Sequence, residues 1–155
     1  MSDSSPPRQP RSGTRPRGPL VLIVEDEDSI REMYAAELAA AGFMVLEAAD
    51  GAAAIEKALQ FGPHAVVLDL MLPEIDGFKV ARRLRSEEAT QGIPIVALTA
   101  LTSKKFEELA LGAGCDSFMS KPVIGAALVG EVVRLMAKAK RSRDSSGPDL
   151  SRLAR

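Results

Sequence analysis

Short apolar stretches alternate with segments of helical periodicity along most of this chain. Four of the stretches are rich in Val, Ile and Leu without alternation, which is typical of strands buried on both faces of a parallel sheet. The predicted strands are residues 20–24, 43–46, 65–69 and 93–98, with a short fifth strand over 116–120. Pro73 cannot extend a strand, so the third strand should end close to Asp69.

The segments between the strands carry helix start and stop signals. Asp28 or Ser29 can cap the first helix, which Gly42 should end. Asp50 caps the second helix, and Gly62-Pro63 stops it. Three more helices are predicted, one from residue 77, one over residues 103–111 and one over residues 124–138.

Strand–helix alternation repeated five times predicts an α/β protein. We expect one parallel sheet with helices on both faces, joined by right-handed crossovers. Among doubly wound sheets, the flavodoxin-like five-stranded order 2-1-3-4-5 fits best, and it places the first and third strands side by side. The second strand is an edge in this order, so its end at Glu47 to Ala49 need not contribute to a site.

Charged and hydroxyl side chains stand where four of the strands end. Each has a plain explanation, and Asp69 alone could simply begin a loop. The predicted strand order places all of them at one edge of the sheet: Glu25 and Asp26, Asp69, Thr99 and Lys121. Three crowded carboxylates repel one another unless a cation joins them, and Mg²⁺ takes oxygen ligands. The set suits phosphoryl transfer, with Asp69 as the nucleophile and Mg²⁺ and Lys121 neutralising charge.

Length and composition indicate one ordinary globular domain. The chain has 155 residues, of which 46% are hydrophobic and 26% charged. The single cysteine, Cys115, excludes an internal disulfide and a cysteine-rich metal site, and we expect no reactivity from it. We expect a cytoplasmic protein, because the chain has neither a secretory signal nor an apolar stretch of roughly 20 residues.

Charge is unevenly distributed around a total of −1. Residues 1–19 and 139–155 each carry +3, and residues 20–138 carry −7. The acidic centre argues against nucleic-acid binding by the folded part. We therefore expect a disordered basic tail over 1–18, a domain over 19–139 and a second disordered basic tail over 140–155.

The chain from about Pro19 to Lys138 resembles a CheY-like receiver domain of the two-component response regulators. The resemblance rests on four motifs in order: Val24-Glu25-Asp26-Glu27, the segment from Asp69 to Gly77, Leu98-Thr99-Ala100, and Ser120-Lys121-Pro122. It implies that Asp69 accepts a phosphoryl group from a phosphohistidine on a histidine kinase or a phosphotransfer protein. It also implies Mg²⁺ held by Asp26, Asp69 and the backbone carbonyl of Met71, with Glu25 assisting.

The resemblance further implies a switch. Thr99 would bond the phosphoryl group and Lys121 would pair with it. As Thr99 moves inward, Phe118 would turn into the vacated space, repacking a face formed by the fourth helix, fifth strand and fifth helix. That face would bind a downstream protein or form a phosphorylation-dependent homodimer. A cis bond at Lys121-Pro122 is usual in the family, and we hypothesise that Met71 and Leu101 shield the acyl phosphate from water.

We expect a stand-alone response regulator, because residues 139–155 are too short for an effector domain. It would not be an enzyme beyond Mg²⁺-dependent self-phosphorylation and slow autodephosphorylation. An intermediate phosphate shuttle is an alternative, and the basic tails could bind nucleic acid only non-specifically. Two rival functions fit the sequence less well. Aspartate-based phosphatases generally place a second acid at the position of Met71, and an FMN-binding flavodoxin would need a phosphate-binding loop after Val24. His64 is assigned no role.

Overall fold

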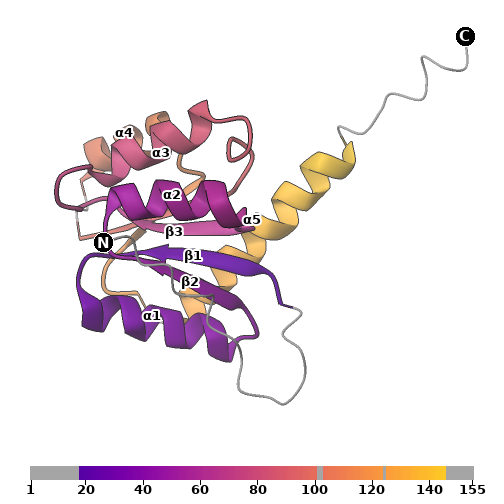
Figure 1. Cartoon of the computed structure of the whole chain (residues 1–155), viewed down its shortest axis with the longest axis horizontal. Helices are drawn as coiled ribbons and strands as arrows, with labels where there is room; N and C mark the ends of the chain where they lie inside the picture. Colours follow the sequence, from indigo (N-terminus) through magenta and orange to yellow (C-terminus); the bar gives the residue numbers. More distant parts are fainter. Residues whose placement is uncertain (1–17, 101–102, 124, 146–155) are drawn as a thin grey trace, which may run out of the picture.

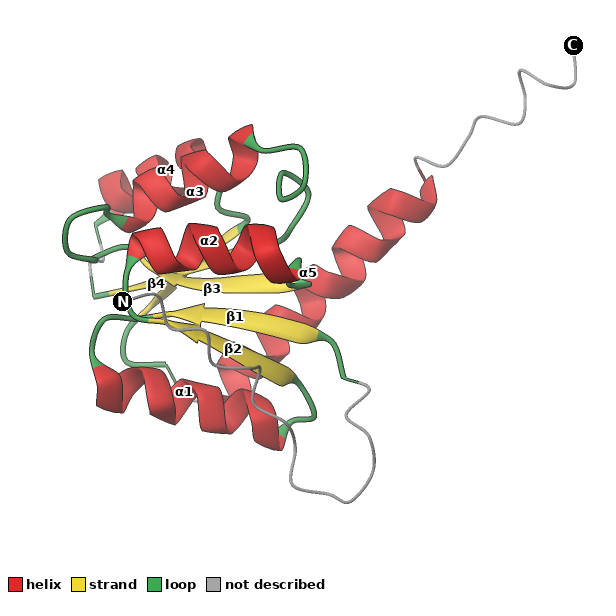
Figure 2. Ribbon diagram, in the orientation of Figure 1, coloured by secondary structure: helices red, strands yellow, loops and turns green. Residues whose placement is uncertain are grey.

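The computed structural model describes residues 18–100, 103–123 and 125–145. In this part of the chain the strands form one parallel sheet in the order β2-β1-β3-β4-β5, which confirms the predicted fold (Figure 2). The strands are β1 (Leu20–Val24), β2 (Met44–Ala48), β3 (Ala65–Asp69), β4 (Ile95–Thr99) and β5 (Ser117–Ser120). Their carboxyl ends lie at the left-hand edge in Figure 2.

Helices cover both faces of the sheet. They are α1 (Asp28–Ala40), α2 (Gly51–Phe61), α3 (Gly77–Ser86), α4 (Lys104–Ala113) and α5 (Gly125–Ser145). Helices α2, α3 and α4 lie on one face, and α1 and α5 lie on the other (Figure 1). This arrangement leaves the carboxyl edge of the sheet open to loops.

The buried core has two layers, one on each face of the sheet. Along β1, Leu22 and Val24 pack toward α2–α4, whereas Val21 and Ile23 pack toward α1 and α5. Every residue of β3 is buried, because this strand lies between β1 and β4 and is covered on both faces. The unbroken apolar runs in the sequence are therefore a direct consequence of a sheet covered on both sides.

Most of the predicted helix ends are confirmed. The Asp50 side chain accepts a hydrogen bond from the backbone N–H of Ala53 at 2.8 Å, and Gly62 ends α2 with φ of 57°. The predicted cap of α1 is wrong, because Glu27 is its N-cap residue and α1 begins at Asp28. The Asp28 carboxylate instead pairs with Arg31 one turn later. Asp28 lies in the first turn of α1, where the helix dipole favours a negative charge.

Helix α5 continues to Ser145, beyond the expected boundary at residue 139. Leu135 and Met136 anchor it against the core, and the next residues are good helix formers, with no glycine before Gly147. Figure 1 shows the last turns of α5 projecting past the sheet. The tails expected over 1–18 and 140–155 otherwise lie largely outside the described residues. Among the described helices, none has both the length and the apolar character needed to cross a bilayer.

Candidate functional site

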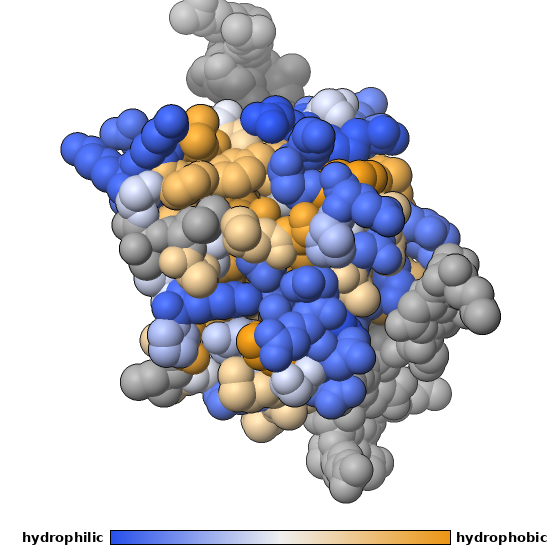
Figure 3. Space-filling view, turned by 90° about the vertical axis from the view of Figure 1, so that its left-hand side faces the viewer, coloured by the Kyte–Doolittle hydropathy of each residue, from blue (hydrophilic) through white to orange (hydrophobic). Residues whose placement is uncertain are grey.

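Three carboxylates meet at the carboxyl edge of the sheet. Glu25 and Asp26 follow β1, and Asp69 is the last residue of β3, the neighbouring strand. One oxygen from each carboxylate lies within 4.8 Å of the others. Glu25 and Asp69 are buried, at 3% and 5% exposure, whereas Asp26 is exposed. We call these three residues the acidic cluster, and Figure 3 views the molecule from this edge, where hydrophilic and apolar side chains adjoin.

Lys121, which follows β5, reaches into the acidic cluster. Its ammonium nitrogen lies 2.7 Å from Glu25 Oε2 and 3.1 Å from Asp69 Oδ2. The backbone N–H of Lys121 donates to the carbonyl of Thr99 at 2.8 Å, and the Lys121-Pro122 bond is cis. The predicted convergence of these strand ends is therefore present in the structure.

The close approach of these charges shifts their pKa values. Burial raises the pKa of Glu25 from 4.5 to about 7, and neighbouring Asp69 adds to the rise while Lys121 opposes it. For Lys121, burial lowers the pKa, but the contacts with Glu25 and Asp69 outweigh burial and raise it above its usual value. The ammonium therefore stays charged at neutral pH, and the cluster carries more potential negative charge than one lysine neutralises.

The loop after β3 orients the Asp69 carboxylate. Asp69 Oδ1 accepts a hydrogen bond from the backbone N–H of Met71 at 2.9 Å, so its two oxygens have different partners. Gly77 closes the loop by donating from its backbone N–H to the carbonyl of Leu70 at 3.1 Å. A Cβ atom at Gly77 would lie 2.4 Å from the Asp69 carbonyl oxygen, so only glycine fits there. The Met71 side chain is 56% exposed, and its suggested companion Leu101 lies outside the described residues.

Thr99 and Phe118 lie on neighbouring strands. Thr99 ends β4 and is fully buried, whereas Phe118 in β5 is half-buried and packs against the core beneath α2–α4. Phe118 pairs with Ala97, two residues before Thr99, so both side chains leave the same face of the sheet. This is the placement that a coupled movement of the two side chains requires.

The sequence matches the response regulator receiver domain family over residues 21–133. The chain belongs to this family. It is 35% identical over 123 residues to the DNA-binding dual master transcriptional regulator RpaA of Synechocystis sp., covering 79% of this chain and 51% of the relative. It is 38% identical over 133 residues to the phosphate regulon transcriptional regulatory protein PhoB of Pseudomonas aeruginosa, covering 84% and 57%.

A solved structure shows the same fold. The receiver domain of a sensor histidine kinase from Pseudomonas aeruginosa, solved with a magnesium ion coordinated in the active site cleft, is 32% identical with a TM-score of 0.73. The match covers 77% of this chain and 98% of that domain. By contrast, the chain spans about half the length of the curated relatives RpaA and PhoB. The shared unit is therefore the receiver domain.

The acidic cluster of this receiver fits a magnesium ion. Receiver domains bind Mg²⁺ at an acidic pocket, and here three carboxylates supply the hard oxygen donors that Mg²⁺ prefers. Asp26 is exposed, so the cluster is open to an ion from solvent, while the buried Glu25 and Asp69 offer fixed oxygens. The donor chemistry and the spacing both agree with the expected cofactor.

Arg31 of α1 makes contacts at this edge that the sequence did not predict. Its guanidinium donates to the backbone carbonyl of Glu25 at 2.9 Å and lies 3.5 Å from the Glu47 carboxylate in β2. The only local signal was the pairing of Arg31 with Asp28 three residues before it. The contact with β2 depends on the fold and could not be read from spacing.

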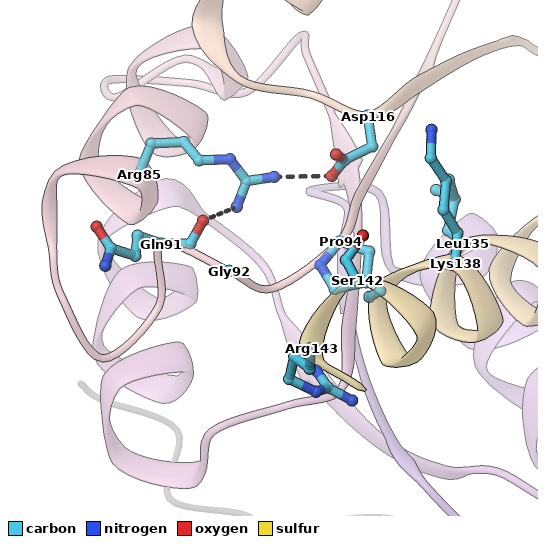
Figure 4. Close-up of a pocket in the computed structure, with 10 residues that line it drawn as sticks. Arg85, Gln91, Gly92, Pro94, Asp116, Leu135, Lys138, Ser142 and Arg143 are labelled. Carbon is cyan, nitrogen blue, oxygen red and sulfur yellow. Dashed lines mark hydrogen bonds and ion pairs between the residues drawn. The ribbon is translucent and has the colours of Figure 1, made fainter. Parts of the chain in front are cut away.

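A separate cavity of about 330 Å³ opens at the opposite edge of the receiver, beside α5 (Figure 4). Arg85 reaches across it to Asp116 at 2.7 Å and to the carbonyl of Gln91 at 2.9 Å. Arg85 also binds the carbonyl of Gly114, next to Cys115. Burial raises the pKa of the Cys115 thiol to about 12, consistent with the expectation of an unreactive residue. These contacts join α3 to the segment before β5, so the polar side chains at the cavity serve the packing of the fold.

Proposed function

We propose that this receiver accepts a phosphoryl group on Asp69 in a Mg²⁺-dependent step. Receiver domains interact with histidine kinases and downstream targets, so the proposed donor is a phosphohistidine on a histidine kinase or phosphotransfer protein. The observation that carries the proposal is the Lys121 ammonium, 3.1 Å from Asp69 and 2.7 Å from Glu25. A buried carboxylate with a cation at one oxygen and a backbone N–H at the other is oriented for attack.

In the proposed step an Asp69 oxygen attacks the phosphorus while the phosphorus–nitrogen bond of the donor breaks. The bonding electrons leave with the imidazole nitrogen, which then takes a proton, and an acyl phosphate remains on Asp69. Asp26, Asp69 and the backbone carbonyl of Met71 would hold Mg²⁺, with Glu25 assisting. The bound ion supplies neutralisation of phosphoryl charge. The Lys121 ammonium would move from the carboxylates to pair with the phosphoryl oxygens. The Thr99 hydroxyl would donate a hydrogen bond to a phosphoryl oxygen.

The proposed output is a change of a protein-binding face. Movement of Thr99 toward the phosphoryl group would let Phe118 turn inward and repack the face formed by α4, β5 and α5. Helices α4 and α5 expose apolar side chains that a partner protein could cover, because Leu109 and Leu111 in α4 and Val133 in α5 are 47–50% exposed.

Stand-alone action, as expected from the sequence, remains a prediction. RpaA is named a DNA-binding regulator and PhoB a transcriptional regulator, and each is about twice as long as the matched region. A role as a phosphate shuttle is distinguished by whether phosphate on Asp69 passes on to a histidine phosphotransfer protein. The absence of specific nucleic-acid binding likewise remains a prediction.

The proposal is tested by incubating the chain with acetyl phosphate and Mg²⁺ and measuring its intact mass. We expect the wild type to gain one phosphate and Asp69→Asn to gain none. Asp144→Asn, on the exposed end of α5, is the matched control and should behave as the wild type. An unmodified wild type, or equal modification of Asp69→Asn, would contradict the proposal.

A further inference from the structure

We propose that Arg31 is a positioning residue for the metal site. By holding the Glu25 carbonyl against β2, Arg31 would set how Glu25 and Asp26 present their carboxylates to Mg²⁺. This inference rests on the proposed function, because it assumes that the acidic cluster binds Mg²⁺. It assigns a function to a residue outside the acidic cluster.

The Arg31 guanidinium is mostly buried and contacts residues in the loop after β1, in its own helix α1 and in β2. Its side chain is 13% exposed, and its terminal nitrogens lie 2.9 Å from the Glu25 carbonyl and 2.7 Å from Asp28 Oδ1. Its Nε lies 3.5 Å from Glu47 Oε1. The Asp28 side chain is 80% exposed, so that pair contributes little to stability. The contacts with Glu25 and Glu47, whose side chain is 17% exposed, are the interior ones.

The contact with the Glu25 carbonyl bears directly on the acidic cluster. This carbonyl belongs to the peptide group that joins Glu25 to Asp26, so its orientation determines where both side chains point. The backbone N–H of Glu25 donates to the carbonyl of Ala48 in β2 at 3.1 Å. With the N–H held by β2 and the carbonyl held by Arg31, the first residue of the loop is fixed at both of its polar backbone groups.

Glu47 gives Arg31 a fixed support. The carbonyl of Glu47 accepts a hydrogen bond from the ammonium of Lys57 at 2.6 Å, and Lys57 in α2 is only 4% exposed. Glu47 is therefore tied to α2 through its backbone and to α1 through its side chain. We expected that the end of β2 need not contribute to the site, but these contacts give β2 an indirect part in it.

The direction in which Mg²⁺ affinity changes when Arg31 is replaced distinguishes a positioning role from a simple electrostatic one. A guanidinium near a cation site repels the cation, so loss of its charge alone would strengthen Mg²⁺ binding. Loss of positioning would weaken binding, and removing groups that orient metal ligands typically costs about 10- to 100-fold in affinity. Arg31→Lys keeps the charge but lacks the planar fork of donors that reaches two acceptors at once.

The test uses the full chain and four proteins: wild type, Arg31→Gln, Arg31→Lys and Arg83→Gln. Arg83 is the matched control, because it pairs with Glu87 on the exposed side of α3. Mg²⁺ dissociation constants are measured by calorimetry and by titration of backbone amide resonances. The rate of phosphorylation by acetyl phosphate is followed against Mg²⁺ concentration. Circular dichroism and urea midpoints report folding.

We expect Arg31→Gln to weaken Mg²⁺ binding about 10-fold and Arg31→Lys to weaken it less, with Arg83→Gln unchanged. The phosphorylation rate at saturating Mg²⁺ should stay close to that of the wild type, which a general loss of folded protein would not give. Should Arg31→Gln fail to fold, Arg31→Lys decides. Unchanged or tighter Mg²⁺ binding by a folded Arg31 variant would overturn the inference alone, whereas a wild type that binds no Mg²⁺ would overturn the proposed function as well.

Discussion

The raised pKa of Glu25 predicts that the receiver loses stability as pH rises when no divalent cation is present. The pKa of Glu25 is about 7 in the folded chain, against 4.5 for an unperturbed glutamate. Between these values the folded state keeps a proton that the unfolded state has released. The free energy of unfolding therefore falls with increasing pH across this range and levels off above pH 7.

The size of the fall follows from the size of the shift. At about 1.4 kcal/mol per pKa unit, the rise of Glu25 from 4.5 to about 7 corresponds to roughly 3 kcal/mol. Lys121 stays protonated throughout, so its own raised pKa adds a constant in this range. Bound Mg²⁺ favours the ionised carboxylate, so added Mg²⁺ should reduce the fall.

Urea denaturation followed by circular dichroism at pH 5 to 8, with a chelator present, measures this dependence. Glu25→Gln removes the titrating group and should flatten the corresponding part of the profile. Glu56→Gln, at an exposed position of α2, is the control and should keep the wild-type fall. If wild type and Glu25→Gln lose stability equally across this range, burial of the Glu25 carboxyl has not raised its pKa and the reasoning fails.

Three further predictions follow from the loop and the ion pairs at the same edge. Gly77→Ala should lower the free energy of unfolding by about 1–3 kcal/mol, because its Cβ would meet the Asp69 carbonyl. Gly112→Ala has open space around it in α4 and should raise the free energy of unfolding by about 0.5–1 kcal/mol. Urea denaturation midpoints of the two variants measure both changes. Lys121→Met should destabilise the chain by roughly 3 kcal/mol in the presence of a chelator, because two buried carboxylates lose their ammonium partner. It should also slow phosphorylation by acetyl phosphate, measured by intact mass. An unchanged melting temperature would contradict the predicted loss of stability. Met71→Asn should admit water and shorten the life of the acyl phosphate several-fold, and equal decay in wild type and variant would rule out shielding by the methionine.

The strands and the position of Asp69 could be predicted because both depend on local pattern, and the strand order followed from the small set of doubly wound sheets that five strand–helix repeats allow. Buried parallel strands leave continuous apolar runs, and Pro73 limits how far β3 can extend, so Asp69 falls at the carboxyl edge. Parallel strands then bring their ends together. For these reasons Glu25, Asp26 and Lys121 could be assigned to one edge before any distance was known.

The contacts that depend on tertiary packing could not be predicted in the same way. Lys121 and Glu25 are 96 positions apart, and their 2.7 Å approach is set by the turn after β5. Arg31 meets Glu47 only because α1 packs beside β2, and the sequence pattern alone placed that strand end outside the site. The length of α5 was missed for a different reason. Its basic last turns have the composition of a solvated tail, yet they continue a helix already anchored by Leu135.

The buried Cys115 can serve as an internal probe of local opening in this receiver. The thiol is 5% exposed with a pKa of about 12, so a thiol-alkylating reagent can react with it only when the segment joining α4 to β5 opens. Because the sequence contains one cysteine, each molecule can gain only one adduct, and the rate at which that adduct appears would report opening at this single place. Alkylation rates with and without phosphate on Asp69 would thus report how far the chemistry at one edge of the sheet alters motion near the other.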